Sequence, residues 1–476
     1  MHMIHWVYDK RWLLITLLLG ALLLFLPVPA GLASAGWKVL VMTICATVLF
    51  ITEPVPLPSV ALLIILGQVF LLGLESSAVA SSLMKDSVLF IMGSLMLAVA
   101  LVKQQLDKRL ALVIVALTGA NVYRIALGLS VFSGLLASFV GEHTVAAMML
   151  PVALTLVHLS EKDEERRRKL AVLFLFSISY ACSMAGIGTP SGGARNAIMI
   201  DYWKDFFVDP ANPATDIYNV SYTTWMFFSY PIFLVQIPFM HFILKRTCPV
   251  PKEHIFHAVR QLRVQVGREG SMRGRHYVAI GLFLCTLFAW IFFSSEVGMG
   301  TIALAGAAAF MLTGLVRWQD LNAGVNWGVV LLYGTAISLG QQMRETGAAA
   351  WVAAKSLELL SPMGMGAGTG LLVAIMLLTT LLTNTMSNGA AVAVLGPVVL
   401  SIALEAGLNP LAAGFVTALA SSFAYFTVIG TPASTIVHSS GYLRPEDFLR
   451  IGWRLALMSF AVLILFATFY WPLLGA

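Results

Sequence analysis

The sequence predicts an all-α protein that crosses a membrane many times. Hydrophobic residues make up 59% of its 476 residues and charged residues only 11%, against about 25% in an average soluble domain. The apolar residues form repeated runs, and a helix needs about 20 such residues to span a bilayer. Two of the runs carry a short polar interruption, and two others contain a Gly-Thr-Pro triplet. We therefore expect about eleven transmembrane helices plus two opposed re-entrant hairpins, arranged as an inverted repeat.

The composition also excludes several classes of protein. A chain this apolar is neither a water-soluble enzyme nor a disordered segment. Its four cysteines are scattered without a CxxC pair, so no disulfide framework or zinc site is expected. The net charge of +6 is assigned to cytoplasmic loops rather than to nucleic-acid binding, because basic residues concentrate on the inner side of membrane proteins. No HExxH motif or Walker lysine occurs, so no metalloprotease or ATP-driven pump is indicated.

The expected spans follow the apolar runs in chain order. They cover residues 12–29, 37–51, 56–74, 88–102, 171–200, 223–244, 277–293, 301–315, 327–339, 411–437 and 456–474. The two interrupted runs, 125–159 and 371–404, are too long for one span and are polar in the middle. Polar backbone at membrane depth is tolerated only where protein or a water-filled cavity satisfies it. We therefore interpret these two runs as hairpins whose tips meet near the midplane.

Loop charges orient the chain. The linker 245–276 carries eight basic residues against two acidic ones. We therefore expect the linker and the N-terminus on the cytoplasmic side of a bacterial inner membrane. Basic residues flank 125–159 on both sides, so this hairpin enters from the cytoplasm. The flanks of 371–404 carry no basic residue, so this hairpin enters from outside.

Three landmarks recur at nearly one spacing. They are Gly93 with Gly334, Pro151 with Pro397, and the Ile-Gly-Thr-Pro runs 187–190 and 429–432, at offsets of 241, 246 and 242 residues. The repeat divides the chain into residues 1–244, with hairpin 125–159 and broken helix 171–200; the linker 245–276; and residues 277–476, with hairpin 371–404 and broken helix 411–437. Inverted repeats with broken helices at their interface are typical of secondary transporters.

The Gly-Thr-Pro triplets predict helix breaks inside the membrane. Proline removes a backbone donor and disfavours helix before it, while glycine permits the turn. A break frees carbonyls for a cation and aims helix N-termini at an anion. An ordinary proline kink is the alternative, but two triplets at the same repeat offset favour a site.

The two polar tips differ in chemistry. Ser387-Asn388-Gly389 offers a hydroxyl and an amide, with Thr383 one turn before it. This tip can bind a carboxylate, cap the helix, or do both. The first tip places Glu142 and His143 at membrane depth, where ionisable residues are usually functional. Glu142 could bind a cation or carry a proton and His143 could meet an anion, or the two could form a structural ion pair. Arg195 could contact an anion or extend to the interface.

These tips and breaks resemble those of the divalent-anion/sodium symporter family of dicarboxylate, citrate and sulfate carriers. The resemblance spans nearly the whole chain, from Thr52-Glu53-Pro54 to Leu474. It implies eleven spans, two opposed hairpins, a homodimer and an elevator-like motion. It also implies a Ser-Asn-Thr signature at each tip, where substrate carboxylates and sodium ions meet. Here the second signature loses only its threonine, whereas the first becomes Gly141-Glu142-His143.

The resemblance also implies site residues. By position, substrate contacts fall on His143, Thr189, Pro190, Ser387, Asn388, Thr431 and Pro432. Glu142 and Arg195, as charges at membrane depth, and Gly389, as part of the second tip, are further candidate substrate contacts from the residues themselves. A first sodium site falls on Gly141, Glu142 and Gly188, and a second on Thr383, Met386, Asn388 and Gly430. No organic cofactor is expected.

The sequence thus predicts a transporter and not an enzyme. Its cargo is a small anion, with a dicarboxylate as the first choice and sulfate, sulfonates or tricarboxylates as alternatives. Sodium coupling is expected for at least one site, while Glu142 leaves proton coupling or sodium-independent exchange open. An anion channel is disfavoured by closed hairpin tips, and a membrane enzyme by the lack of a catalytic constellation.

Overall fold

The structure is a computed structural model that describes residues 10–104, 113–114, 116–161, 163–250, 254–267, 272–428 and 430–475. Regular structure in these ranges is helical, apart from one isolated bridge between Asn121 and His254. By length and composition, the described residues contain eight helices able to cross a membrane, or eleven if each of three bent pairs counts as one span. The predicted all-α polytopic fold class is confirmed.

The helices of the first half lie close to the predicted segments. They are α2 (Arg11–Phe25), α3 (Ser34–Thr52), α4 (Leu57–Phe70), α5 (Ser76–Ser82), α6 (Asp86–Val102), α8 (Val122–Val140), α9 (Glu142–Ser160), α10 (Glu164–Ala185), η1 (Pro190–Gly192), α11 (Ala194–Phe207), η2 (Pro213–Tyr218), α12 (Tyr222–Thr247) and α13 (Phe256–Gly267). The predicted span 12–29 is shorter in the structure, because Pro27 and Pro29 cannot continue the helix. The linker is partly outside the described residues, at 251–253 and 268–271.

The second half of the chain also contains long and broken helices. They are α14 (Gly274–Val297), α15 (Met299–Leu312), α16 (Trp318–Gly324), α17 (Trp327–Glu345), α18 (Ala348–Leu360), η3 (Ser361–Met363), α19 (Gly368–Thr383), α20 (Asn388–Glu405), α21 (Pro410–Ala420), α22 (Pro432–His438), α23 (Pro445–Leu465), η4 (Phe466–Tyr470) and η5 (Trp471–Leu474). The predicted broken helix 411–437 is therefore α21 and α22. Ile429, in the second triplet run, lies outside the described residues.

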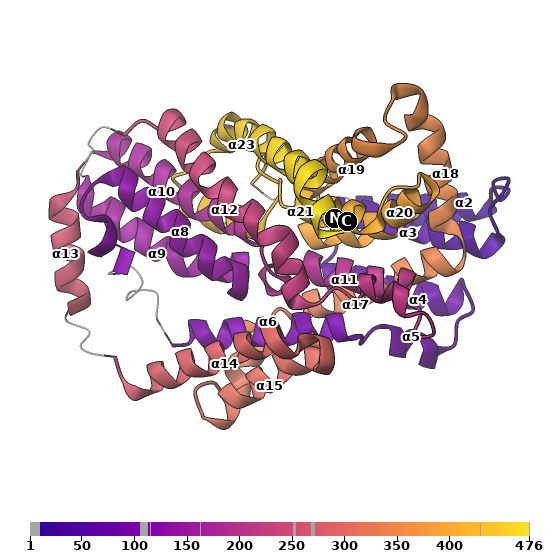
Figure 1. Cartoon of the computed structure of the whole chain (residues 1–476), viewed down its shortest axis with the longest axis horizontal. Helices are drawn as coiled ribbons and strands as arrows, with labels where there is room; N and C mark the ends of the chain where they lie inside the picture. Colours follow the sequence, from indigo (N-terminus) through magenta and orange to yellow (C-terminus); the bar gives the residue numbers. More distant parts are fainter. Residues whose placement is uncertain are drawn as a thin grey trace, which may run out of the picture.

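The two hairpins enter the molecule from opposite ends. In Figure 1, α8 and α9 occupy the left part of the view, while α19 and α20 occupy the right part. Helices α8 and α9 pack against each other, as do α19 and α20. Helix α13 crosses the left end and α18 the right end, transverse to the long helices. This arrangement directs both hairpin tips toward the middle of the molecule.

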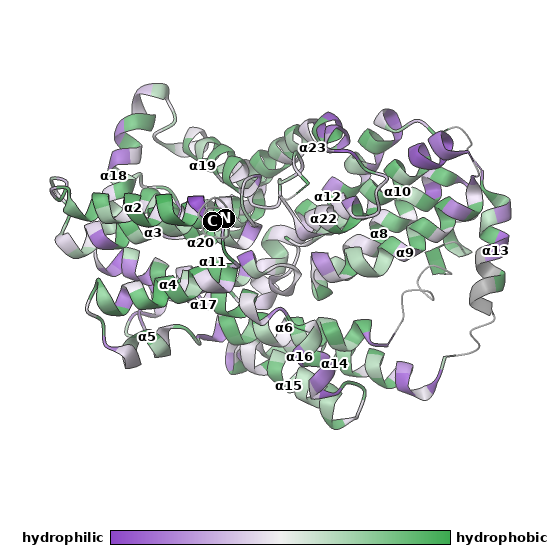
Figure 2. Cartoon of the chain, turned by 180° about the vertical axis from the view of Figure 1, so that it is seen from behind, coloured by the Kyte–Doolittle hydropathy of each residue, from purple (hydrophilic) through white to green (hydrophobic). Residues whose placement is uncertain are grey.

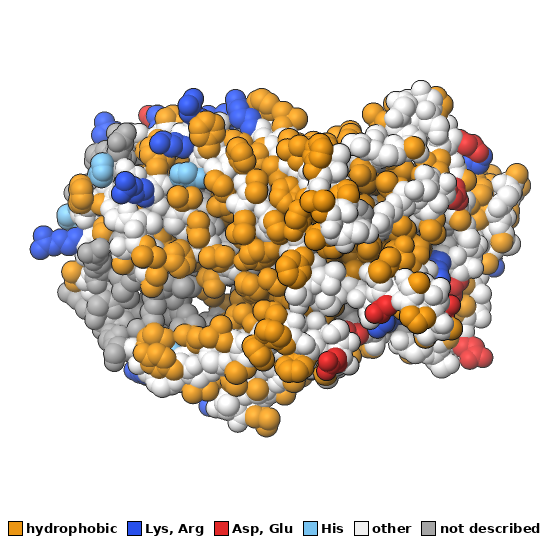
Figure 3. Space-filling view, viewed as in Figure 1, with side chains coloured by type: hydrophobic (Ala, Val, Ile, Leu, Met, Phe, Trp, Pro, Cys, Tyr) orange, Lys and Arg blue, Asp and Glu red, His pale blue; other side chains and the backbone are white. Residues whose placement is uncertain are grey.

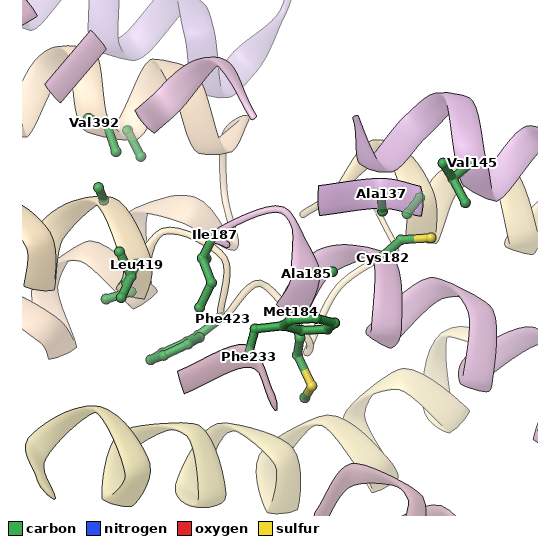
Figure 4. Packing of buried hydrophobic residues seen from close by; sticks show 14 of the residues in the cluster. Ala137, Val145, Cys182, Met184, Ala185, Ile187, Phe233, Val392, Leu419 and Phe423 are labelled. Atoms are coloured by element: carbon green, nitrogen blue, oxygen red, sulfur yellow. The ribbon is translucent and has the colours of Figure 1, made fainter. Parts of the chain in front are cut away.

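Helix α10 is the buried centre of the hairpin region. Sixteen consecutive residues, Leu170 to Ala185, are buried, and α10 packs against α8, α9, α12 and α22. Figure 4 shows apolar side chains from several helices meeting around its end, with Met184 and Ile187 close to Phe423. Close packing of this kind holds the backbone of both breaks in place.

A carboxylate joins α6 to α15. Asp86 begins α6, and its two oxygens accept hydrogen bonds from the backbone N–H groups of Met299 (3.1 Å) and Gly300 (3.0 Å) at the start of α15. A carboxylate at a helix N-terminus satisfies free donors and opposes the helix dipole. Further along, a Cβ at Gly93 would lie 2.5 Å from Cβ of Ala303, so only glycine permits this close helix contact.

Polar and charged residues concentrate at the ends of the long helices. Figure 2 shows hydrophobic colouring along most helices, with hydrophilic residues at α13, at the start of α10 and at α18. On the face in Figure 3, Lys and Arg gather at the left end and Asp and Glu mostly at the right. This separation matches the charge difference between loops on which the sequence-based orientation rests.

Candidate functional site

Each hairpin tip is a break between two helices. Gly141 separates α8 from α9 and has φ +96° and ψ 142°, a conformation that glycine adopts far more readily than other residues. In the second hairpin, residues 384–387 separate α19 from α20. Ser387 is the N-cap of α20, and its hydroxyl accepts a long hydrogen bond (3.4 Å) from the backbone N–H of Ala390. Both tips therefore present a helix N-terminus to the centre of the molecule.

Both Gly-Thr-Pro triplets break their helices as predicted. Pro190 begins η1 after α10, and Pro432 begins α22, the next helix after α21. Thr431 caps α22, because its hydroxyl accepts from the N–H of Ser434 at 3.1 Å. The hydroxyl of Thr189 instead donates to the Ser138 carbonyl on α8. Both threonine hydroxyls are therefore engaged in hydrogen bonds within the protein.

The two tips meet through Glu142. Its Oε1 accepts one hydrogen bond from Nδ2 of Asn388 and another from Nη1 of Arg195, each at 3.3 Å. Glu142 is 6% exposed and Arg195 2% exposed. Residues from the first tip, the second tip and the first helix break thus form one buried polar cluster. The alternatives of a Glu142–His143 ion pair and of an Arg195 that extends to the interface are wrong, because Glu142 and Arg195 pair with each other.

Two glycines make room for the arginine, and a third keeps the turn around it compact. A Cβ at Gly186 would lie 2.6 Å from Nη2 of Arg195, and one at Gly193 would lie 2.7 Å from Nη1. A Cβ at Gly192 would lie 2.7 Å from the Gly186 carbonyl, so this turn must stay compact. The guanidinium therefore lies inside the first helix break. Within the described part of the chain, its Nε and Nη2 atoms and Oε2 of Glu142 have no hydrogen-bond partner.

A cavity of about 690 Å³ opens at this cluster. Its volume is within the usual range for small-molecule sites. Nine of the predicted site residues line it, namely Gly141, Glu142, His143, Pro190, Arg195, Ser387, Asn388, Gly389 and Pro432. The cavity does not reach Thr189 or Thr431, which are fully buried.

Oxygen atoms converge at the foot of the second tip. The Thr383 hydroxyl lies 2.8 Å from Oδ1 of Asn388 and 2.6 Å from the carbonyl oxygen of Ser421, and all three residues are buried. Neighbouring Ser422 has a buried hydroxyl without a partner among the described residues. Hydroxyl, amide and carbonyl oxygens are the ligands that hard cations prefer. The residues at this position therefore fit a sodium ion.

The first predicted sodium site has a different composition. Its Gly188 carbonyl accepts from the Ser229 hydroxyl at 3.1 Å, and Glu142 is paired with Arg195. A cationic side chain is thus already in contact with the only charged ligand of this site. These residues do not fit a second sodium ion beside Arg195.

Sequence reasoning missed several residues of the site. Tyr333, Glu53 and Asn326 also line the cavity, and Ser421 contributes its carbonyl to the second tip. Glu53 has φ 41° and ψ 46°, a left-handed conformation that is uncommon outside glycine and that ends α3. Glu53 and Asn326 stand at helix ends and resemble interfacial residues in the sequence. Among the described residues, no group of three or more His, Cys, Asp or Glu side chains could hold a metal ion.

Opposed hairpins that meet at a buried polar cavity, between two broken helices, define the chain as a membrane transporter. It belongs to the sodium:sulfate symporter family, because the family model described as the sodium:sulfate symporter transmembrane region matches residues 9–476. The protein is therefore a multi-pass membrane transporter and not an enzyme.

Named relatives are similar over nearly their whole length. A transporter without an assigned function from Haemophilus influenzae is 27% identical, covering 89% of each chain. The sodium-dependent dicarboxylate transporter SdcS of Staphylococcus saprophyticus is 26% identical, covering 96% of this chain and 91% of the relative. A sodium-dependent high-affinity dicarboxylate transporter of Caenorhabditis elegans is also 26% identical, covering 90% and 82%.

Two solved transporters share the fold. The YdaH transporter of Alcanivorax borkumensis aligns with a TM-score of 0.53 at 15% identity, covering 81% of this chain and 86% of that one. MtrF of Neisseria gonorrhoeae, described as illuminating a class of antimetabolite efflux pumps, aligns with a TM-score of 0.55 at 12% identity, covering 98% and 94%. At this identity the likeness concerns the fold alone.

Proposed function

We propose that this protein is a secondary active transporter of small anions, with dicarboxylates as its principal cargo. The observation that carries the proposal is the cavity between the two tips, where Ser387, Asn388 and Gly389 lie at the start of α20 beside the buried guanidinium of Arg195. Helix N-termini attract anions through free N–H groups and the helix dipole. Relatives named as dicarboxylate transporters support this choice of anion.

Sodium binds in this proposal at the second tip. Thr383, Asn388 and the Ser421 carbonyl supply converging oxygens there, and the family resemblance adds Met386 and Gly430 to this set. Because Asn388 also lines the cavity, a cation bound here would lie close to the anion and offset its charge. Sodium binding and substrate binding would then strengthen each other.

Arg195 acts as a fixed cation at the first break. Its charge is balanced by Glu142, so protonation of Glu142 or its displacement would leave the guanidinium free to face an anion. This pair favours a second candidate function, in which the protein is a proton-coupled carrier or a sodium-independent exchanger. In either case the protein would transport fewer sodium ions per anion than a carrier in which both predicted sodium sites bind sodium.

Alternating access would be an elevator-like motion of one group of helices past another. The moving group, which we name the carrier bundle, consists of α8 to α12 and α19 to α23, because these hold both tips and both breaks. The frame consists of α2 to α6 and α14 to α17. We further propose a homodimer in a bacterial inner membrane with the N-terminus and the linker in the cytoplasm. The equivalence of residues 1–244 and 277–476 as inverted repeats belongs to this proposal.

The experiment is uptake of radiolabelled succinate into proteoliposomes under separate sodium and proton gradients. We expect saturable uptake that a sodium gradient drives. Counter-substrate exchange that ignores both gradients would instead establish the exchanger. Asn388→Ala should abolish uptake, whereas Asn219→Ala, in an exposed loop, should not. Uptake that rises linearly with concentration would contradict a carrier and indicate a channel.

A further inference from the structure

The second tip lacks a side chain where the resemblance implies a threonine. A Cβ built on Gly389 would lie 2.4 Å from both the hydroxyl oxygen and Cε1 of Tyr333, and 2.5 Å from its Cζ. Non-bonded carbon atoms are normally about 3.5–4.0 Å apart. The phenol of Tyr333 therefore fills the room that any side chain at position 389 would take.

Tyr333 reaches this tip from the frame. It lies on α17, lines the cavity and is 9% exposed. Ser387, Glu142 and Arg195 line the same cavity. The phenol group thus lies in the wall of the same cavity that the predicted substrate contacts line.

In this conformation a second tyrosine, Tyr202 on α11, contacts both α17 and α20. The Tyr202 hydroxyl lies 2.8 Å from the carbonyl oxygen of Ala393 on α20 and 3.2 Å from that of Ala336 on α17. Ala336 follows Tyr333 by three residues, and Ala393 follows Gly389 by four. These contacts keep α17 against α20 in this conformation, where the phenol of Tyr333 lies against Gly389.

We propose that Tyr333 is a substrate-binding residue that donates, from α17, the hydroxyl hydrogen bond that position 389 cannot supply. A phenol hydroxyl has one donor hydrogen, and a hydrogen bond to a charged acceptor is worth more than one between neutral groups. The substrate group it recognises is an anionic oxygen held at the start of α20. This inference rests on the proposed function and adds a specificity-determining residue to it.

The first test is Tyr333→Phe, which removes the hydroxyl and keeps the ring. Succinate binding to the purified protein should weaken about tenfold. The matched control is Thr335→Val on the same helix, because the Thr335 hydroxyl bonds to the Leu332 carbonyl and lies outside the cavity. If Tyr333→Phe binds succinate with unchanged affinity, the inference is overturned, and Tyr333 only lines the cavity without bonding to the substrate.

The second test exchanges the hydroxyl between the two positions. Gly389→Thr alone should abolish binding, because the side chain collides with Tyr333. Tyr333→Ala alone should weaken binding at least as much as Tyr333→Phe. The double variant Tyr333→Ala/Gly389→Thr should bind more tightly than either single variant, since it has both the space and a hydroxyl. If the double variant binds succinate no more tightly than Gly389→Thr, a hydroxyl at position 389 does not replace that of Tyr333, which contradicts the inference.

The wild-type measurement separates this inference from the proposed function. If the wild-type protein binds none of succinate, citrate and sulfate, the proposed function fails and this inference fails with it. If the wild-type protein binds succinate and Tyr333→Phe binds it equally well, only the inference fails. Thermal unfolding of each variant shows whether a loss of binding reflects a loss of folding.

Discussion

The residue that connects the site is Glu142. It stands at the first position of α9 and accepts hydrogen bonds from Arg195 on α11 and from Asn388 on α20. A buried ion pair contributes little net stability compared with apolar packing, but the loss of one partner leaves a costly unpaired charge. Glu142 and Arg195 should therefore tolerate joint replacement better than single replacement.

Glu142→Gln or Arg195→Gln alone should destabilise the purified protein by about 3–5 kcal/mol, because each leaves the other charge buried without its partner. The double variant should recover a large part of that stability. The measurement is thermal or denaturant unfolding of the four proteins as a double-mutant cycle. Additive losses would show that the two charges do not act as a pair in the folded protein.

Thr383 is the residue whose replacement tests the proposed sodium site. Thr383→Val keeps the shape of the side chain but removes the oxygen that lies between Asn388 and the Ser421 carbonyl. The sodium concentration needed for half-maximal succinate binding should rise about tenfold or more, the effect of losing one ligand to a charged group. Thr417→Val on α21 is the control, because that hydroxyl bonds only within its own helix, to the Ala413 carbonyl. Equal sodium dependence in Thr383→Val and wild type would exclude this oxygen as a ligand.

At the scale of the element, each hairpin depends on the residue at its break. A Cβ at Gly141 would meet only His143, at 3.7 Å, which is an ordinary contact. The cost of a side chain there comes from the backbone, because φ +96° with ψ 142° is strained for any residue with a Cβ. Position 141 therefore tests conformation separately from crowding.

Gly141→Ala should lower the free energy of unfolding by about 1–3 kcal/mol. Gly274→Ala is the matched control, since a Cβ there meets nothing within 4 Å and its φ is not positive. Thermal unfolding of both variants checks the prediction. A Gly141→Ala protein as stable as the control would mean that the tip adopts another backbone conformation.

Element boundaries were predictable where proline and glycine interrupt apolar runs. The predicted hairpin 125–159 is α8 and α9, which together cover Val122 to Ser160, and the hairpin 371–404 is α19 and α20. Helices α5, α13, α16 and α18 were not predicted. They are short or less apolar, and their positions depend on packing at the ends of the long helices rather than on a spanning run of their own.

At the scale of the whole molecule, an ion pair joins the frame to the carrier bundle. Lys85, just before α6, pairs with Asp205 and lies 3.8 Å from Asp201, both on α11. An elevator-like motion would have to separate these groups, so a covalent link between α6 and α11 should block it. A rocking motion that preserves this contact would tolerate the link.

The test replaces Lys85 and Asp205 with cysteine in a background without the four native cysteines, Cys45, Cys182, Cys248 and Cys285. A short bifunctional thiol reagent should cross-link the pair and abolish succinate uptake, and each single-cysteine variant should keep its uptake after the same treatment. Full uptake by the cross-linked protein would contradict the proposed motion.

The sequence by itself determined the class of the protein, its membrane spans and the places where helices break. These follow from local physics: apolar length for a span, and proline or glycine for a break. It also identified Glu142, His143 and Arg195 as unusual, because charge at membrane depth is costly. Only the tertiary structure decided how they are used. Arg195 pairs with a residue 53 positions away and Glu142 with Asn388, 246 positions away.

Tyr333 shows the same limit most clearly. In the sequence it is one aromatic residue in an apolar run, which indicates core packing as readily as a site. Its role depends on a gap left by Gly389, a residue 56 positions further along the chain, and on α17 packing against α20. A pattern along one chain carries no record of which distant backbone atoms lie within van der Waals contact, so this contact could be found only in three dimensions.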